Sequence, residues 1–195
     1  LQERAEASVG DPGAMGLFGF AVGTLLIAIP IAGILPLKAV PAALPAVLVF
    51  AGIAQFLAGL VAFRKGNTFS GTAFCSYGAN NTLIATYYLL VGSGVIAANS
   101  NDKLMLGIEL FCFAYISIIL GIAASRVNLE FVAILLALVP GFALAAVANV
   151  GGPAAIGNVG GYFLILSAGF AFYGASALVI NSSFQRTVLP LASRA

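Results

Sequence analysis

Six long apolar stretches, with almost every charged residue in the short gaps between them, constrain this chain more than any other feature. The stretches cover residues 15–35, 42–63, 71–97, 104–124, 131–150 and 160–181. Each is long enough to cross a hydrocarbon core of about 30 Å, which takes roughly 20 apolar helical residues. Helices also satisfy the backbone hydrogen bonds that the core leaves without water. The sequence therefore predicts an all-α membrane protein with six transmembrane helices.

The composition excludes a soluble globular domain. Of the 195 residues, 62% are hydrophobic and 7% are charged, against roughly 45–50% and 25% in soluble domains. We expect one six-helix transmembrane domain at 15–182, between a cytoplasmic N-terminal segment at 1–14 and a cytoplasmic tail at 183–195. The segment around Glu3, Arg4 and Glu6 lacks the basic n-region of a secretory signal, so no cleavage is expected.

The distribution of Lys and Arg predicts the orientation. An even number of spans places both termini on one side, together with Arg4, Arg64, Lys65, Arg126, Arg186 and Arg194. Only Lys38 and Lys103 fall on the other side. Because cytoplasmic loops carry the excess of Lys and Arg, we expect a multi-pass protein of the plasma (inner) membrane with both termini in the cytoplasm.

Polar and aromatic side chains on shared helix faces are the candidate functional residues. They are Phe20 with Thr24, Gln55, Tyr77 with Asn80 and Asn81, and Leu138 with Asn149. An unpaired amide costs several kcal/mol in hydrocarbon, so these groups are expected to face the bundle interior. From the residues alone two interpretations stay open. The groups either line a narrow path for a small polar solute or hold neighbouring helices together by hydrogen bonds.

Three segments carry a family resemblance. They are DPGAMGLFGF (11–20), AGIAQFLAGLVAFRKGNTFSGTAFCSYG (51–78) and INSSFQRTVLPL (180–191). In order and spacing the chain resembles the acetate uptake transporters, the acetate/succinate permease family. This resemblance implies six-helix protomers, each with its own pore, assembled as a homohexamer. It also implies that acetate, and in some members succinate, is moved across the plasma membrane.

The resemblance also implies roles for individual residues. A hydrophobic constriction of a phenylalanine, a tyrosine and a leucine matches Phe20, Tyr77 and Leu138, although counting forward from Phe131 would select Leu136. The N-terminal motif matches Asp11, Pro12, Gly16 and Leu17, and family amides match Gln55 and Asn149. Thr24, Asn80 and Asn81 are further candidates for polar groups along the path.

Three departures from the family pattern leave the cargo open. Asp11, Gly13, Ala14 and Met15 stand where the family has Asn, Ala, Pro and Leu, so the N-terminal turn can differ. Ala62 replaces a glutamate. Asn80 and Asn81 replace a pair of bulky aromatic residues, which makes the path more polar beside the predicted constriction.

Neither a histidine-based proton relay, nor an ATP-binding motif, nor a metal site is expected. The chain has no histidine, so a buried carboxylate–histidine relay is absent, and it has no GxxxxGK[ST] motif for ATP. Glu109 lies within an apolar stretch and is interpreted as an interface residue, with proton sensing as the alternative. Cys75 and Cys112 are expected to pack as small hydrophobic residues, without a disulfide or metal.

The function implied is a plasma-membrane channel or proton-linked carrier for acetate and related small carboxylates, succinate included. The alternatives are a channel for small neutral solutes such as urea or ammonia and a membrane structural or sensory subunit without flux. An enzyme is disfavoured, because the spans contain no catalytic triad, metal cluster or paired carboxylates. Expected partners are the carboxylate, membrane lipid and further copies of the chain; no cofactor and no nucleic acid are expected.

Overall fold

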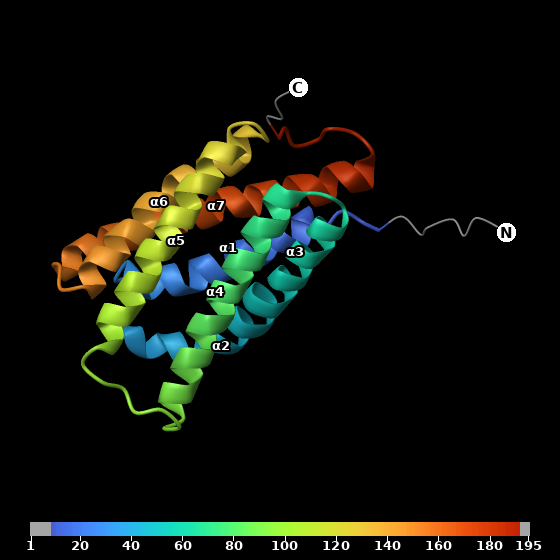
Figure 1. Ribbon diagram of the computed structural model, residues 1–195. Coiled ribbons are helices and arrows are strands. Elements are labelled where there is room, and N and C mark those ends of the chain that lie inside the picture. The colour runs from blue at the N-terminus through green and yellow to red at the C-terminus, as the bar shows by residue number, and fades with distance from the viewer. Residues whose placement is uncertain (1–8, 192–195) are drawn as a thin grey trace.

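The computed structural model describes residues 9–191 and is all-helical (Figure 1). The elements are α1 (Gly13–Ile31), η1 (Leu37–Ala39), α2 (Val40–Ala46), η2 (Val47–Ala54), α3 (Gln55–Arg64), α4 (Thr68–Gly92), α5 (Asp102–Ala124), α6 (Leu129–Asn149) and α7 (Ala154–Phe184). Elements η1 to α3 follow one another without a break and form one long composite helix, Leu37–Arg64. Glu3, Arg4, Glu6 and Arg194 lie outside the described residues.

Within residues 9–191, five helices are long and apolar enough to cross a membrane: α1, the composite helix, α5, α6 and α7. This establishes a helical, multi-pass membrane protein. The remaining long helix, α4, has 25 residues and is therefore long enough to cross a membrane, but it carries several Ser, Thr and Asn side chains. Ser70, Asn80 and Asn81 of α4 are buried, so these polar groups face other helices of the bundle.

The helices pack so that both described ends of the chain lie at the same end of the bundle (Figure 1). Helix α7 packs against α1 and α6, α5 packs against α6, and α3 packs against α4. The α3–α4 and α5–α6 turns lie near the two described ends of the chain, and Arg64, Lys65 and Arg126 are in or next to these turns. We call this the basic end. The α4–α5 and α6–α7 connections lie at the far end.

Glycines allow neighbouring helices to approach closely. A Cβ on Gly78 of α4 would lie 2.6 Å from the backbone nitrogen of Phe56 and 2.9 Å from the carbonyl oxygen of Gly52. A Cβ on Gly160 of α7 would lie 2.9 Å from the backbone nitrogen of Ala145 in α6. Because backbone atoms cannot rotate away as a side chain can, these contacts set the distance between the helices.

Several helix boundaries differ from the sequence-based expectation, among them the start of α7 and the end of α4. Helix α7 begins at Ala154 rather than near residue 160, because Pro153 starts the helix and the small residues that follow are accommodated in it. Helix α4 ends at Gly92 rather than near residue 97, and Gly94 then turns the chain with a φ of 75°.

The composite helix changes its winding directly before Gln55. Residues Val47–Ala54 are π-helical, and Pro45, which has no N–H to donate, lies in the turn before them. Gln55 follows the π-helical segment and is fully buried. A Cβ on Gly19 of α1 would lie 2.8 Å from the Cβ of Gln55, so α1 packs directly on this residue.

Candidate functional site

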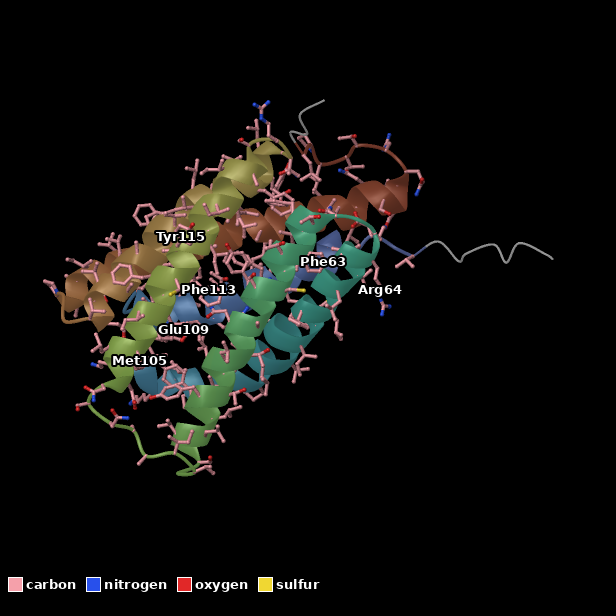
Figure 2. The ribbon with its side chains drawn as sticks, in the orientation of Figure 1. Phe63, Arg64, Met105, Glu109, Phe113 and Tyr115 are labelled. Atoms are coloured by element: carbon pink, nitrogen blue, oxygen red, sulfur yellow. The ribbon has the colours of Figure 1, made fainter. Side chains whose placement is uncertain are left out.

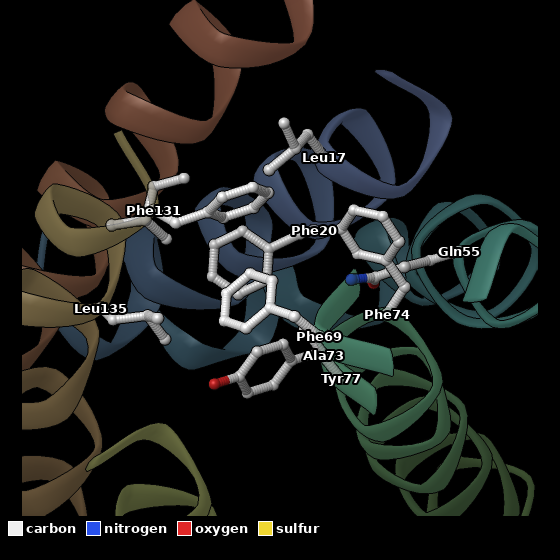
Figure 3. A pocket seen from close by; sticks show the side chains of 10 residues that line it. Leu17, Phe20, Gln55, Phe69, Ala73, Phe74, Tyr77, Phe131 and Leu135 are labelled. Carbon is white, nitrogen blue, oxygen red and sulfur yellow. The ribbon is translucent and has the colours of Figure 1, made fainter. Parts of the chain in front are cut away.

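Two small cavities follow one another along the interior of the bundle. The first, which we call the aromatic cavity, has a volume of about 20 Å³ and is lined by Leu17, Phe20, Gln55, Phe69, Ala73, Phe74, Tyr77, Phe131, Ile134 and Leu135 (Figure 3). The second, which we call the amide cavity, has a volume of about 40 Å³ and is lined by Phe20, Gly23, Thr24, Ile27, Ile31, Tyr77, Asn80, Asn81, Ile84, Leu110, Phe142 and Leu164. Along α1 and α4 the lining residues of the aromatic cavity come first, so this cavity is nearer the basic end.

Phe20 and Tyr77 line both cavities. Their ring centroids are 5.3 Å apart with an interplanar angle of 59°, a tilted arrangement typical of favourable aromatic pairs. Both side chains are buried. The structure therefore brings together two of the three residues expected at the constriction and places them where the two cavities meet.

A hydrogen bond from α5 holds the Tyr77 side chain. The Tyr77 hydroxyl lies 2.8 Å from the Oγ of Ser117, and this Oγ donates to the carbonyl oxygen of Phe113 at 2.7 Å. Since the Ser117 proton is used there, the Tyr77 hydroxyl donates to Ser117. The rings of Phe113 and Phe142 each lie 6.4 Å from the Tyr77 ring. Tyr77 is thus fixed at its polar tip and packed around its ring.

Leu138 is fully buried in the same core, but it lines neither cavity. On α6 it lies between Leu135, which lines the aromatic cavity, and Phe142, which lines the amide cavity. The other candidate, Leu136, is 71% exposed and faces away from the interior. The geometry therefore favours Leu138 over Leu136 as the leucine at the level of Phe20 and Tyr77.

Gln55 and Asn81 form a buried amide pair with a fixed orientation. The Nδ2 of Asn81 donates to the carbonyl oxygen of Ala51 and to the Oε1 of Gln55, both at 3.3 Å. Because the Ala51 carbonyl only accepts, Asn81 must present its nitrogen there, and Gln55 must present its oxygen to Asn81. The Nε2 of Gln55 is left buried without a partner among the described residues. Figure 3 shows this amide beside the rings of the aromatic cavity.

Asn80 differs from its neighbour Asn81. Its side chain is 5% exposed and lines the amide cavity together with the partly buried Thr24. The Oδ1 of Asn80 is buried and has no hydrogen-bond partner in the part of the chain that the structure describes. Buried polar atoms are almost always paired with protein, water or ligand. The wall of this cavity therefore holds an acceptor that can bind a ligand.

The N-terminal motif shapes the start of α1. The Oδ1 of Asp11 accepts a hydrogen bond from the backbone nitrogen of Gly13 at 2.9 Å, and Pro12 is the N-cap of the helix. The Nζ of Lys65 donates to the carbonyl oxygen of Val9 at 3.1 Å, which ties this segment to the α3–α4 turn. The backbone of Gly16 faces the Phe74 ring, and Leu17 lines the aromatic cavity.

Further residues singled out in the sequence lie away from the cavities. Asn149 donates from Nδ2 to the carbonyl oxygen of Ala145 in its own helix at 2.9 Å and lines neither cavity. Cys75 and Cys112 are free cysteines, and Cys112 is exposed. Glu109 is partly buried, and its Oε1 has no partner within residues 9–191. Figure 2 shows Glu109 on α5, between Met105 and Phe113.

Several lining residues were not singled out in the sequence: Phe69, Phe74, Phe131, Phe142 and Leu164, with Ser117 behind Tyr77. A helical repeat could have found some of them. Phe69, Ala73 and Tyr77 recur every four residues on α4. On α1 the lining residues Leu17, Phe20, Thr24, Ile27 and Ile31 alternate between spacings of three and four, which keeps them on one face.

A bundle of membrane-spanning helices with two aligned cavities is the architecture of a membrane transport protein. The chain belongs to the GPR1/FUN34/yaaH family, which matches residues 1–193, and the resemblance to the acetate uptake transporters is thereby confirmed. It is 33% identical over 181 residues to the succinate-acetate/proton symporter SatP of Escherichia coli K12, covering 93% of this chain and 94% of that protein.

A structural relative and a more distant relative extend the comparison. The solved structure described as the bacterial acetate channel SatP superimposes with a TM-score of 0.84 at 29% identity and covers 94% of this chain and 99% of that one. The ammonia transport outward protein 2 of Saccharomyces cerevisiae is 26% identical over 171 residues, which are 86% of this chain and 60% of the yeast protein.

Proposed function

We propose that this protein is a channel or proton-linked carrier for acetate and related small carboxylates, with succinate as a larger cargo. The observation that carries the proposal is the position of Phe20 and Tyr77, which line both cavities and close the space between them. A solute that follows the two cavities must pass this ring pair. The names of the bacterial relatives, a succinate-acetate/proton symporter and an acetate channel, support acetate as the cargo.

On this proposal, the path for the solute is closed in the present conformation. A cavity needs about 10–15 Å³ to hold one water molecule, so the aromatic cavity of about 20 Å³ has room for little more than one. Its wall is apolar, although the side chains of Gln55 and Tyr77 contribute to it. A narrow apolar segment of this kind gates by excluding water. Passage of acetate then requires the rings of Phe20 and Tyr77 to move apart within the core that also contains Leu138.

The orientation and the number of spans are part of the same proposal. With α4 as the sixth crossing, both termini and the basic end face the cytoplasm. Arg64, Lys65 and Arg126 then raise the local concentration of anions at the inner mouth. The membrane is the plasma membrane, and the N-terminal segment and the tail after α7 lie on its cytoplasmic face.

We also propose that the protomers assemble as a homohexamer. Large apolar side chains are exposed along α5, among them Met105 and Tyr115 (Figure 2). In the membrane such a surface is covered either by lipid or by another copy of the chain. Native mass spectrometry of the purified protein should give six chains, and a mass of one or two chains would exclude the hexamer.

Flux of labelled acetate into proteoliposomes tests the function. Reconstituted protein should transport acetate well above protein-free vesicles, and succinate more slowly because it is larger. A second candidate, a channel for neutral solutes, is favoured by the free Asn80 amide and by the name of the yeast relative. Flux of urea or ammonia without acetate would support that candidate. No flux of any of these solutes would support a structural or sensory subunit.

A further inference from the structure

We propose that the amide cavity binds its solute as a neutral, planar group, either a protonated carboxylic acid or a primary amide, through the free side-chain amide of Asn80. This inference rests on the proposed function and names the form in which the solute enters. Asn80 and Asn81 are neighbours on α4, but only Asn81 is used to hold helices together. The side chain of Asn80 makes no hydrogen bond with any residue of 9–191, and its Oδ1 is buried.

The chemistry of Asn80 selects among the forms of a carboxylate. A primary amide offers an acceptor oxygen and an N–H donor side by side. A carboxylic acid has the complementary pair, so that its O–H donates to Oδ1 while its carbonyl oxygen accepts from Nδ2. A carboxylate anion has only acceptors. It would leave Oδ1 unpaired and facing a negative oxygen, whereas the acid supplies the donor that this buried oxygen lacks.

The rest of the wall also disfavours an anion. No residue that lines the amide cavity carries a charge; its polar groups are the hydroxyls of Thr24 and Tyr77 and the two amides. A buried anion without a cationic partner pays a large cost of desolvation. The volume of about 40 Å³ corresponds to roughly three water molecules, which suits a solute with few non-hydrogen atoms.

This form of binding carries the proton with the cargo. The acid enters as RCOOH, crosses the ring pair and releases H⁺ and RCOO⁻ on the other side. One proton therefore moves with each carboxylate, and the transfer needs no side-chain relay through the bundle. The chain contains no histidine that could serve as one.

Acetamide and methanesulfonate distinguish the neutral form from the anion. Acetamide has the size of acetic acid, does not ionise near neutral pH and can make the same two hydrogen bonds. Methanesulfonate is a permanent anion of similar size. Acetamide should inhibit uptake of labelled acetate into proteoliposomes with equal potency at pH 6 and pH 7.5, and methanesulfonate should inhibit weakly or not at all. Inhibition by methanesulfonate equal to that by acetamide would overturn the proposal.

Substitution of Asn80 tests the site itself. Asn80→Leu should weaken inhibition by acetamide roughly tenfold, as expected for two lost hydrogen bonds. Asn158→Leu is the matched control, because Asn158 is exposed at the start of α7 and lines neither cavity. Equal inhibition of Asn80→Leu and the control would contradict the assignment.

A binding measurement separates this proposal from the proposed function. Acetamide should raise the unfolding temperature of the detergent-solubilised wild-type protein, and methanesulfonate should not. Wild-type vesicles without acetate flux would refute the proposed function, whereas flux together with no stabilisation by acetamide would refute the Asn80 site alone. The comparison of the two solutes on the wild type decides the matter even where Asn80→Leu does not fold.

Discussion

The ring of Phe20 on α1 packs against the ring of Tyr77 on α4 at a centroid distance of 5.3 Å, and this pair is shared by the walls of both cavities. The two helices are far apart in sequence, so the contact depends on the packing of the whole bundle. Tyr77 is tethered to Ser117, whereas Phe20 has no polar tip and is held by packing alone. Phe20 can therefore move aside without breaking a hydrogen bond, whereas movement of Tyr77 breaks its bond to Ser117.

Truncation of the ring pair should increase flux. Phe20→Ala and Tyr77→Ala each remove the bulk that excludes water between the cavities. We expect acetate flux to rise severalfold and succinate to pass more readily, measured in proteoliposomes at matched amounts of folded protein. Leu138→Ala should have a smaller effect, because Leu138 lines neither cavity. Leu136→Ala on the exposed face of α6 is the control. Unchanged rates and selectivity in all three variants would exclude the constriction.

The hydrogen bond between Tyr77 and Ser117 should contribute measurably to the free energy of unfolding. Ser117→Ala leaves the buried Tyr77 hydroxyl without its acceptor, which costs about 1–3 kcal/mol of unfolding free energy. Tyr77→Phe should cost less, because Ser117 keeps its bond to the Phe113 carbonyl. The double variant should therefore be close in stability to Tyr77→Phe. Thermal unfolding of the four proteins in detergent measures these differences, and additive losses would rule out the bond.

Substitution of Asn80 and substitution of Asn81 should have different effects on the yield of folded protein. Asn81→Leu removes the N–H donor that the carbonyl oxygen of Ala51 and the Oε1 of Gln55 share in the buried interior. This loss should lower the yield of monodisperse protein. Asn80→Leu removes no hydrogen bond within the bundle and should leave the yield close to that of the wild type. Size-exclusion chromatography compares them directly. Loss of yield in Asn80→Leu but not in Asn81→Leu would reverse the roles of the two amides.

Much of the fold could be predicted from the sequence, because long apolar stretches are a direct signal of membrane-spanning helices. The ends of the helices were less predictable. Hydropathy does not mark where α7 begins, since the residues after Pro153 are small and compatible with both loop and helix. Family resemblance supplied Phe20, Tyr77 and Leu138, and all three residues are buried.

The separate roles of the two asparagines could not be predicted. Asn80 and Asn81 lie within one turn of Tyr77, and only the position of Ala51 and Gln55 shows which amide is already bonded. Ser117 gave little signal, because a serine within a membrane helix commonly bonds a carbonyl of its own helix, as this one also does. Such roles are set by tertiary partners.

The close approach at Gly78 should not tolerate a methyl group. Gly78→Ala would place a Cβ 2.6 Å from the backbone nitrogen of Phe56, so α3 and α4 would have to separate. We expect a loss of about 1–3 kcal/mol of unfolding free energy, the range known for overpacked interiors. Gly169→Ala is the control, because nothing lies within 4 Å of a Cβ there. Alanine in that helix interior should stabilise by roughly 0.5–1 kcal/mol. Equal unfolding temperatures would contradict the packing.

Cysteine labelling tests the orientation of the bundle. In a background of Cys75→Ala and Cys112→Ala, single cysteines would be introduced by Asn101→Cys in the α4–α5 connection and by Thr187→Cys after α7. Both positions are exposed and lie at opposite ends of the bundle. With Arg64, Lys65, Arg126 and Arg186 on the cytoplasmic side, an impermeant maleimide added to intact cells should modify the cysteine at 101. The cysteine at 187 should react only after the cells are permeabilised. The reverse pattern would invert the orientation, and labelling of both from outside would mean that α5, α6 and α7, which lie between the two positions, do not all cross the membrane.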